Sequence, residues 1–191
     1  FSSDLTLIEF VYILSYVIRW NKVKILIDAM NNSDYSNSQY FVWIDADMTV
    51  LDMGVKMEGI GLQFPDADII MSSDAIADSP DSNVHDIPPG QVNSGLIFVR
   101  NTPLARHILL QWWSGYERSR MSDQSAFILL FNEMPKHERD KLAILRPDAL
   151  NTLFPAWLNQ QSSNQFLHLA GNIMHYKMRI WFCNISTYIV S

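Results

Sequence analysis

The sequence has a single cysteine, Cys183, so no disulfide can form within the chain. It also lacks a long apolar run: the most apolar stretch, residues 5–18, falls short of the ~20 residues that a transmembrane helix needs, and Glu9 interrupts it. Basic residues are scarce, with 14 Lys and Arg against 20 Asp and Glu, which argues against a nucleic-acid-binding protein. Internal repeats and low-complexity linkers are absent.

What is present indicates one globular domain. Hydrophobic residues make up 48% of the 191 residues and charged residues 18%, enough apolar surface for one sizeable core. We expect a single domain over residues 1–191 with its core at 20–180 and atypical ends at 1–19 and 180–191. Because the chain starts at Phe1 and enters an apolar run almost at once, we also expect a fragment of a longer protein.

The most informative stretch is Tyr40-Phe41-Val42-Trp43-Ile44-Asp45-Ala46-Asp47. Five bulky apolar residues predict a buried strand, covered by helices on both faces because the run does not alternate. Asp45 and Asp47 follow where the strand ends, the place at which open α/β sheets bind ligands. Two acids this close are costly unless a cation neutralises them, although acids are also common in ordinary turns.

Strands and helices alternate along the rest of the chain, which predicts an α/β fold. Expected strands cover residues 67–71, 95–99, 143–145 and 165–169. Expected helices cover residues 6–20 and 22–30, the second capped by Asn21, and others begin at Thr102-Pro103, at Ser122 and after Pro135. Residues 75–90 form a long polar loop, and such loops are often functional.

Several polar residues are candidates for a metal and phosphate site. Asp45 and Asp47 suit Mg²⁺ or Mn²⁺, and His168, at another strand end, is the candidate third ligand that favours Mn²⁺. Gly171 would let the backbone approach a phosphate, and Lys177 would contact a diphosphate. A core histidine, a plain turn and a solvated face are the respective alternatives.

Four further residues are candidates for contacts to a substrate. Asn93 precedes a buried strand, Asp123 and Gln124 lie at a helix start, and Asp74 follows the second strand. Ordinary turns and the favourable helix dipole also explain Asn93 and Asp123.

In combination these segments resemble the GT-A glycosyltransferases. Residues 43–47 resemble their DxD motif, and 92–101, 122–126 and 168–171 follow in the usual order. The resemblance covers about residues 20–180. It is closest to fungal α-1,2-galactosyltransferases, α-1,6-mannosyltransferase subunits and plant xyloglucan xylosyltransferases. Trp20-Asn21-Lys22 is similar to the Trp-x-Lys element that precedes the DxD motif in this family.

The resemblance implies transfer of a hexose or pentose from a nucleotide sugar to a glycan or glycoprotein, with retention and with Mn²⁺ or Mg²⁺. Asp45 would contact the ribose and metal-bound water, and Asp47 and His168 would ligate the metal. Gly171 and Lys177 would approach the diphosphate.

Near the transferred sugar the resemblance implies Asn93, Asp123 and Gln124, with Asp74 contacting donor or acceptor hydroxyls. We expect Asp123 or Gln124 to stabilise an oxocarbenium-like sugar from beneath while the acceptor attacks from the leaving-group side.

The resemblance also carries expectations about the ends and the compartment. The strand and loop that normally hold the nucleotide base are not recognisable before Asp45, so we expect an N-terminally incomplete GT-A fold. Family members are usually type II Golgi membrane proteins, which implies a secretory lumen and an anchor outside this chain. The sequons at Asn31 and Asn184 agree with that compartment.

Two other functions remain open at this stage. Ile44-Asp45-Ala46-Asp47-Met48-Thr49 also matches the pattern of HAD-type phosphohydrolases, in which Asp45 would be the nucleophile and Asp47 a general acid. However, a convincing later acidic pair is not found. The other alternative is a non-enzymatic one, an inactive subunit or a fragment that binds a metal or a sugar without turnover.

Overall fold

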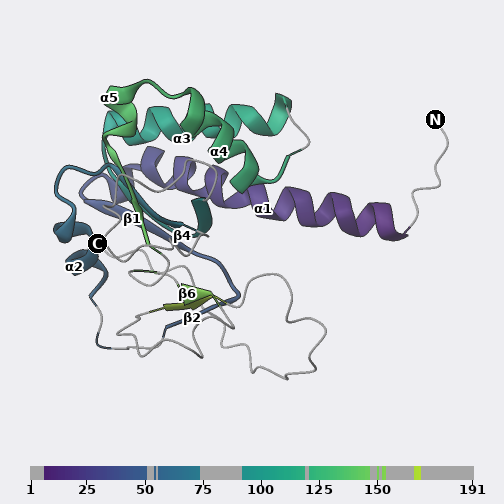
Figure 1. Cartoon of the computed structure of the whole chain (residues 1–191), viewed down its shortest axis with the longest axis horizontal. Helices are drawn as coiled ribbons and strands as arrows, with labels where there is room; N and C mark the ends of the chain where they lie inside the picture. Colours follow the sequence, from purple (N-terminus) through teal and green to yellow (C-terminus); the bar gives the residue numbers. More distant parts are fainter. Residues whose placement is uncertain are drawn as a thin grey trace.

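The computed structural model of the chain describes residues 7–50, 54, 56–73, 92–118, 121–146, 150, 152–153 and 166–168. Figure 1 shows helices packed above a central sheet, with a smaller sheet below it. The helices are α1 (Leu7–Asn31), the 3-10 helix η1 (Ser33–Tyr35), α2 (Met57–Gln63), α3 (Pro103–Arg118), α4 (Asp123–Glu133) and α5 (Lys136–Arg139). The strands are β1 (Tyr40–Ile44), β2 (Met48–Val50), β3 (Ile69–Ser73), β4 (Val92–Arg100), β5 (Leu142–Leu145), β6 (Thr152–Leu153) and β7 (Phe166–His168).

The central sheet has the strand order β1-β4-β3-β5 and is mixed. β4 runs antiparallel to both β1 and β3, whereas β3 and β5 are parallel. The carboxyl ends of β1, β3 and β5 therefore meet the amino end of β4 at one edge of the sheet. The smaller sheet has the order β2-β7-β6. Its strand β2 follows β1 after a short turn, so the two sheets meet at that same edge.

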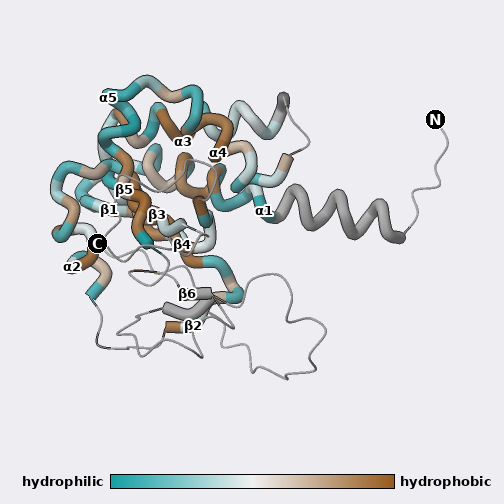
Figure 2. Tube along the Cα trace, in the orientation of Figure 1, coloured by the Kyte–Doolittle hydropathy of each residue, from teal (hydrophilic) through white to brown (hydrophobic). Residues whose placement is uncertain are grey.

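Each face of the central sheet packs on its own hydrophobic cluster. Alternate residues such as Ile97 and Val99 join the cluster formed with α1, α3 and α4. Their neighbours Leu96 and Phe98 join a second cluster that includes residues of α2 and β2. Apolar residues accordingly concentrate on the central strands (Figure 2). A strand buried on both faces reads as a continuous apolar run, which is why β4 shows no alternation.

The first strand differs from its prediction. β1 is the outermost strand on one side of the described sheet, with β4 as its only neighbour there, and only Phe41 of its five residues is buried. Three of the others, Val42, Trp43 and Ile44, contact the two clusters but remain half-exposed, because the strand has a neighbour on one side only. β3 and β5 are fully buried, as is most of β4. An apolar run signals contact on both faces and does not reveal the order of strands in a sheet.

The N-terminal helices were also predicted wrongly, because α1 is one continuous helix. Asn21 was expected to cap a second helix, yet it lies inside α1 and is exposed. Asparagine is only a modest helix breaker, and neither Gly nor Pro interrupts this stretch. Trp20, Val23 and Ile27 are all buried in the cluster with α3 and α4, and this packing outweighs the weak local signal.

Other predicted elements are confirmed with small shifts in their bounds. Thr102 Oγ1 accepts a hydrogen bond from Ala105 N (3.1 Å) and caps α3, while Ser122 Oγ accepts one from Ser125 N (3.2 Å) and caps α4. Sequence reasoning missed β2, α2 and β6, which are all short. The predicted loop at 75–90 lies outside the described residues. Among the described residues, no helix has the length and apolar character of a membrane span.

Candidate active site

Asp45 lies at the carboxyl end of β1, in the turn that leads into β2. Its backbone N–H donates to Gly95 O (2.7 Å), and its carbonyl accepts from Met48 N (3.0 Å), which closes the turn. The Asp45 side chain is 26% exposed. Asp47, at the other side of the turn, is exposed. The two acids are thus presented differently, one partly inside the protein and the other toward solvent.

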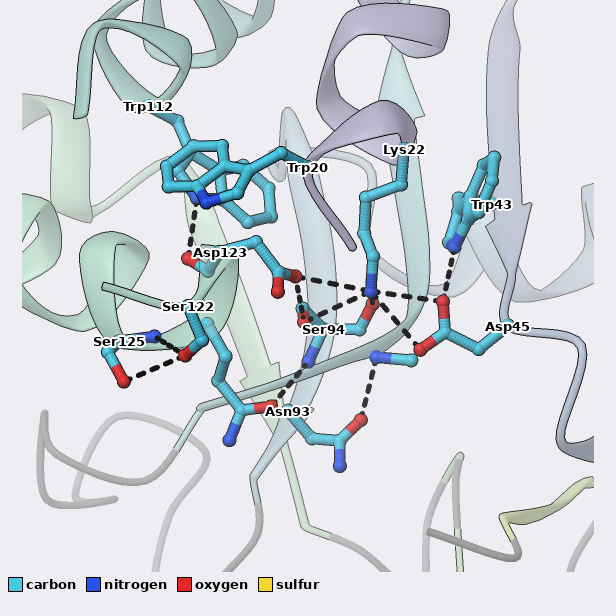
Figure 3. A network of polar contacts seen from close by, with 12 residues as sticks. Trp20, Lys22, Trp43, Asp45, Asn93, Ser94, Trp112, Ser122, Asp123 and Ser125 are labelled. Atoms are coloured by element: carbon cyan, nitrogen blue, oxygen red, sulfur yellow. Dashed lines mark hydrogen bonds and ion pairs between the residues drawn. The ribbon is translucent and has the colours of Figure 1, made fainter. Parts of the chain in front are cut away.

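Lys22 of α1 contacts the Asp45 carboxylate from within the fold. Its Nζ lies 3.0 Å from Asp45 Oδ1 and 3.1 Å from Oδ2. Trp43 Nε1 also donates to Asp45 Oδ1, at 2.6 Å. Both oxygens of this carboxylate are therefore held by the protein, which fixes the plane of the group (Figure 3).

The amino end of β4 supplies the next part of the site. The register between β3 and β4 shifts between Met71 and Ser72, so residues 94–96 of β4 form a bulge opposite β3. Asn93 Oδ1 accepts a hydrogen bond from Gly95 N (2.8 Å) and stabilises this local turn. Ser94 then offers both its carbonyl (3.0 Å) and its hydroxyl (3.3 Å) to Lys22 Nζ. Bulges re-aim side chains in this way beside functional sites.

The start of α4 completes the network in Figure 3. Asp123 is 3% exposed, and its Oδ2 accepts from Ser94 Oγ (2.8 Å) and lies 3.2 Å from Lys22 Nζ. Its carbonyl accepts from Trp112 Nε1 (2.8 Å). The half-buried Gln124 follows, with its Oε1 accepting from Ser94 N at 3.4 Å. The helix start is thus held against the sheet edge by charge and by hydrogen bonds.

Residues that could hold a metal lie at the β1–β2 turn. β2 pairs antiparallel with β7, and Met48 is the register partner of His168. The pairing brings the backbone of His168 beside the residue that follows Asp47. Among the described side chains, no three His, Cys, Asp or Glu residues gather as a metal centre. The His168 side chain lies outside that set.

The carboxylates and the register together are compatible with a divalent cation. The Lys22–Asp45–Asp123 cluster has one cation and two anions, so it carries one net negative charge. Asp47 adds a further acid at the turn. Hard oxygen donors with a nearby histidine form the donor set that Mn²⁺ accepts.

The structure brings some predicted site residues together and leaves others undescribed. Asp45, Asn93, Asp123 and Gln124 meet at one edge of the sheet, through Lys22 and Ser94. Of the remaining candidates, Asp74, Gly171 and Lys177 lie outside the described residues, and their predicted roles stay predictions.

Sequence reasoning placed Lys22 in a Trp-x-Lys element but gave no role to Lys22, Ser94 or Trp43. A further signal was available for Lys22, which precedes Leu26 by four residues and so shares the apolar side of α1 with it. A lysine in that phase needs a buried acidic partner. The sequence does not identify that partner, because Asp123 is a hundred residues away.

Comparison with known proteins agrees with this arrangement. Residues 17–184 match the family of nucleotide-diphospho-sugar transferases. The fold is similar to the crystal structure of a glycosyltransferase involved in the glycosylation of the major capsid of PBCV-1, with a TM-score of 0.59 and 18% sequence identity. The alignment covers 91% of this chain and 79% of that chain. Comparison with curated protein sequences gives no match.

These findings decide between the two enzyme classes left open by the sequence. The family match spans most of the chain, and the α/β fold is that of GT-A glycosyltransferases, so the phosphohydrolase reading of Asp45 is set aside. The predicted fold class is confirmed, while the narrower fungal and plant subfamily stays a prediction. The chain belongs to the nucleotide-diphospho-sugar transferase family, glycosyltransferases that use a nucleotide sugar as donor.

Proposed function

We propose that this chain transfers a hexose or pentose from a nucleotide-diphosphate sugar to a glycan or glycoprotein acceptor, with retention and with Mn²⁺ or Mg²⁺. The observation that carries the proposal is the meeting of three segments at one sheet edge. They are the Asp45–Asp47 turn, the start of β4 and the start of α4. A donor whose diphosphate binds at the turn would direct its sugar toward the start of α4.

The proposed metal site consists of Asp47 and His168, with Asp45 holding the ribose and metal-bound water. The exposure of Asp47 and the pairing of Met48 with His168 support this assignment. When bound, the cation would neutralise charge on the departing diphosphate. Asp45 suits an orienting role, because Lys22 and Trp43 already hold both of its oxygens.

In the proposed reaction the bond between the anomeric carbon and the diphosphate oxygen breaks. A bond from the anomeric carbon to the acceptor oxygen forms on the same face, and the acceptor proton passes to the departing diphosphate. Positive charge that develops on the sugar needs a polar group beneath the ring. Asp123 is buried and ion-paired, so we assign that contact to Gln124, which is half-buried and lies next to it.

A donor-hydrolysis screen tests the proposal most directly. Purified protein is incubated with a panel of nucleotide sugars, with Mn²⁺, Mg²⁺ or EDTA, and release of nucleoside diphosphate is measured. We expect one donor to be consumed and EDTA to abolish the reaction. Protection of the fold by Mn²⁺ without consumption of any donor would instead favour the inactive metal-binding fragment.

We also propose that the chain works in the secretory lumen, with any membrane anchor lying outside residues 1–191. The first sequon supports this, since Asn31, Asn32 and Ser33 are all exposed. Secreted expression of wild-type protein and of Ser33→Ala checks it. We expect digestion with an N-glycan-removing enzyme to shift the mass of the wild type, and Asn31 to carry glycan only in that form. An unmodified Asn31 in the secreted wild type would count against the proposal.

A further inference from the structure

Lys22 joins three segments that are distant in the sequence. Its ammonium contacts Asp45 after β1, Ser94 at the start of β4 and Asp123 at the start of α4. The five acceptor atoms lie between 3.0 and 3.3 Å from Nζ. Figure 3 shows the ammonium between the two acids.

The ammonium of Lys22 is buried among groups of the protein itself. Its side chain is 5% exposed, and an ammonium has only three N–H donors, which the five acceptors share. We therefore expect Lys22 to affect transfer through the groups that it holds. Among these, Asp45 lies at the proposed donor side, and Asp123 fixes the helix start that carries Gln124.

Neighbouring contacts make the same connection rigid. Two residues before Lys22 on α1, Trp20 donates from Nε1 to Met121 O (3.1 Å), just before α4. Trp112 of α3 donates to Asp123 O (2.8 Å) on the other side of that helix start. The start of α4 is therefore held by α1 through an indole and an ammonium, and by α3 through a second indole. A displacement of Asp123 relative to Asp45 is opposed by all three contacts.

We propose that Lys22 is a positioning residue of the transferase site, which keeps the donor-binding acid Asp45 and the sugar-side start of α4 in register. The inference rests on the proposed function, because it assigns the two ends of the network to the two parts of the donor. A displacement of about 1 Å between reacting groups costs on the order of 100-fold in rate. The predicted defect is therefore one of turnover rather than of donor affinity.

Kinetics of Lys22→Met test the proposal, with Lys24→Met as the matched control. Lys24 lies on the same helix, is exposed and pairs with Asp28 in the next turn. For Lys22→Met we expect a fall in kcat of about 100-fold with a much smaller change in donor KM, at temperatures where circular dichroism shows a folded protein. Lys24→Met keeps both constants. A folded Lys22→Met protein with wild-type kcat overturns the proposal.

Loss of the ammonium also leaves two carboxylates facing one another, so Lys22→Met will lower the unfolding temperature by roughly 10 °C. If that prevents folding, the comparison is made in an Asp123→Asn background, where the charge change is balanced. We expect Lys22→Met to lower kcat further in that background, because Asp45 still loses its contact. Equal kcat values for Asp123→Asn alone and for Asp123→Asn combined with Lys22→Met would show that Lys22 does not position Asp45.

The outcomes separate this inference from the proposed function. If wild-type protein consumes no nucleotide sugar, the proposed function fails and the positioning role fails with it. If wild-type protein transfers sugar while Lys22→Met does so equally well, only the positioning role fails. Lys22→Arg adds a further check, since a planar guanidinium restores the charge without the same geometry and should leave kcat low.

Discussion

Each end of the central sheet contains a buried acid, and the two acids have different surroundings. At the site end, Asp123 is 3% exposed and has an ammonium and a hydroxyl within 3.2 Å. At the opposite end, Glu138 of α5 is 8% exposed, and the imidazoles of His107 and His137 lie 3.9 and 4.0 Å from its carboxylate. Its Oε2 has no hydrogen-bond partner among the described residues.

The difference indicates where this protein requires accurate geometry. Short contacts to charged groups hold an acid in one orientation, whereas contacts near 4 Å leave it free to adjust. The far end of the sheet needs only to exclude water and join α5 to α3 and β5. The site end must keep several segments within the tolerance of a chemical reaction. Substitutions at the site end should therefore lower turnover, whereas substitutions at the opposite end should leave turnover unchanged.

Asp47→Asn should have the largest effect on activity. The residue is exposed, so the fold should keep its stability, while loss of a metal-binding carboxylate should lower kcat/KM by at least about 100-fold. Donor-hydrolysis kinetics and thermal unfolding measure the two quantities. Asp66→Asn, at an exposed acid far from the turn, serves as the control and should change neither. Full activity of Asp47→Asn would remove this residue from the site.

Ser94→Ala should have an intermediate effect at the same end. The substitution deletes the hydroxyl that donates to Asp123 Oδ2, and a hydrogen bond to a buried charge contributes about 2 kcal/mol. We expect that loss in denaturant unfolding, together with a fall in kcat of about tenfold as the start of α4 loosens. Ser114→Ala is the control, since its hydroxyl bonds only to a carbonyl one turn earlier in α3. A Ser94→Ala protein with wild-type kcat would contradict the contrast between the two ends.

Gly61→Ala tests packing at the far end. An added Cβ would lie 2.8 Å from Tyr40 Cζ, and the ring cannot move easily because its hydroxyl donates to Gly61 O (3.1 Å). Overpacking costs about 1–3 kcal/mol, and alanine regains up to about 1 kcal/mol of helix propensity. We expect a net loss of about 1 kcal/mol with unchanged kcat.

Gly59→Ala provides the matched control in the same helix. Its added Cβ would meet only Lys56 Cβ, at 3.9 Å, so the propensity gain should appear alone and stabilise the protein slightly. If both alanine variants behave alike, steric contact with Tyr40 does not decide the cost.

Glu138→Gln should have the smallest effect. The substitution removes a charge whose imidazole partners are distant and largely exposed, so the free energy of unfolding should change by less than about 1 kcal/mol. Turnover should not change. A loss as large as that of Ser94→Ala would show that Glu138 is held as tightly as Asp123, and the contrast between the two ends would not stand.

Local signals in the sequence predicted much of this structure. The capping hydroxyls of Thr102 and Ser122 located two helix starts, because a cap depends on residues within one turn. The apolar run before Asp45 located a strand and its end. The edge position of β1 was missed, since strand order depends on distant pairing. The continuity of α1 through Asn21 was missed for a related reason, as packing against α3 overrode a weak local preference.

The sequence pointed to the acids of the candidate site and to Gln124, but not to the groups that contact them. Short motifs record residues at strand ends and helix starts, and these are the positions of Asp45, Asp47, Asp123 and Gln124. Their cation, Lys22, lies inside a helix and is buried only because that helix packs over the sheet edge. A buried polar network depends on three-dimensional coincidence, and no spacing in the sequence encodes it.

The pairing of β2 with β7 has a consequence for the order in which the protein becomes competent. Met48 and His168 are neighbours in the smaller sheet, yet every residue between them must be synthesised before they can meet. Closing so long a loop is slow, and pairings of this kind form late in folding. By contrast, α1 and β1 are adjacent in the chain and are synthesised early. A nascent chain would thus hold Asp45 before it could assemble the proposed metal site, so donor handling would await the synthesis of β7.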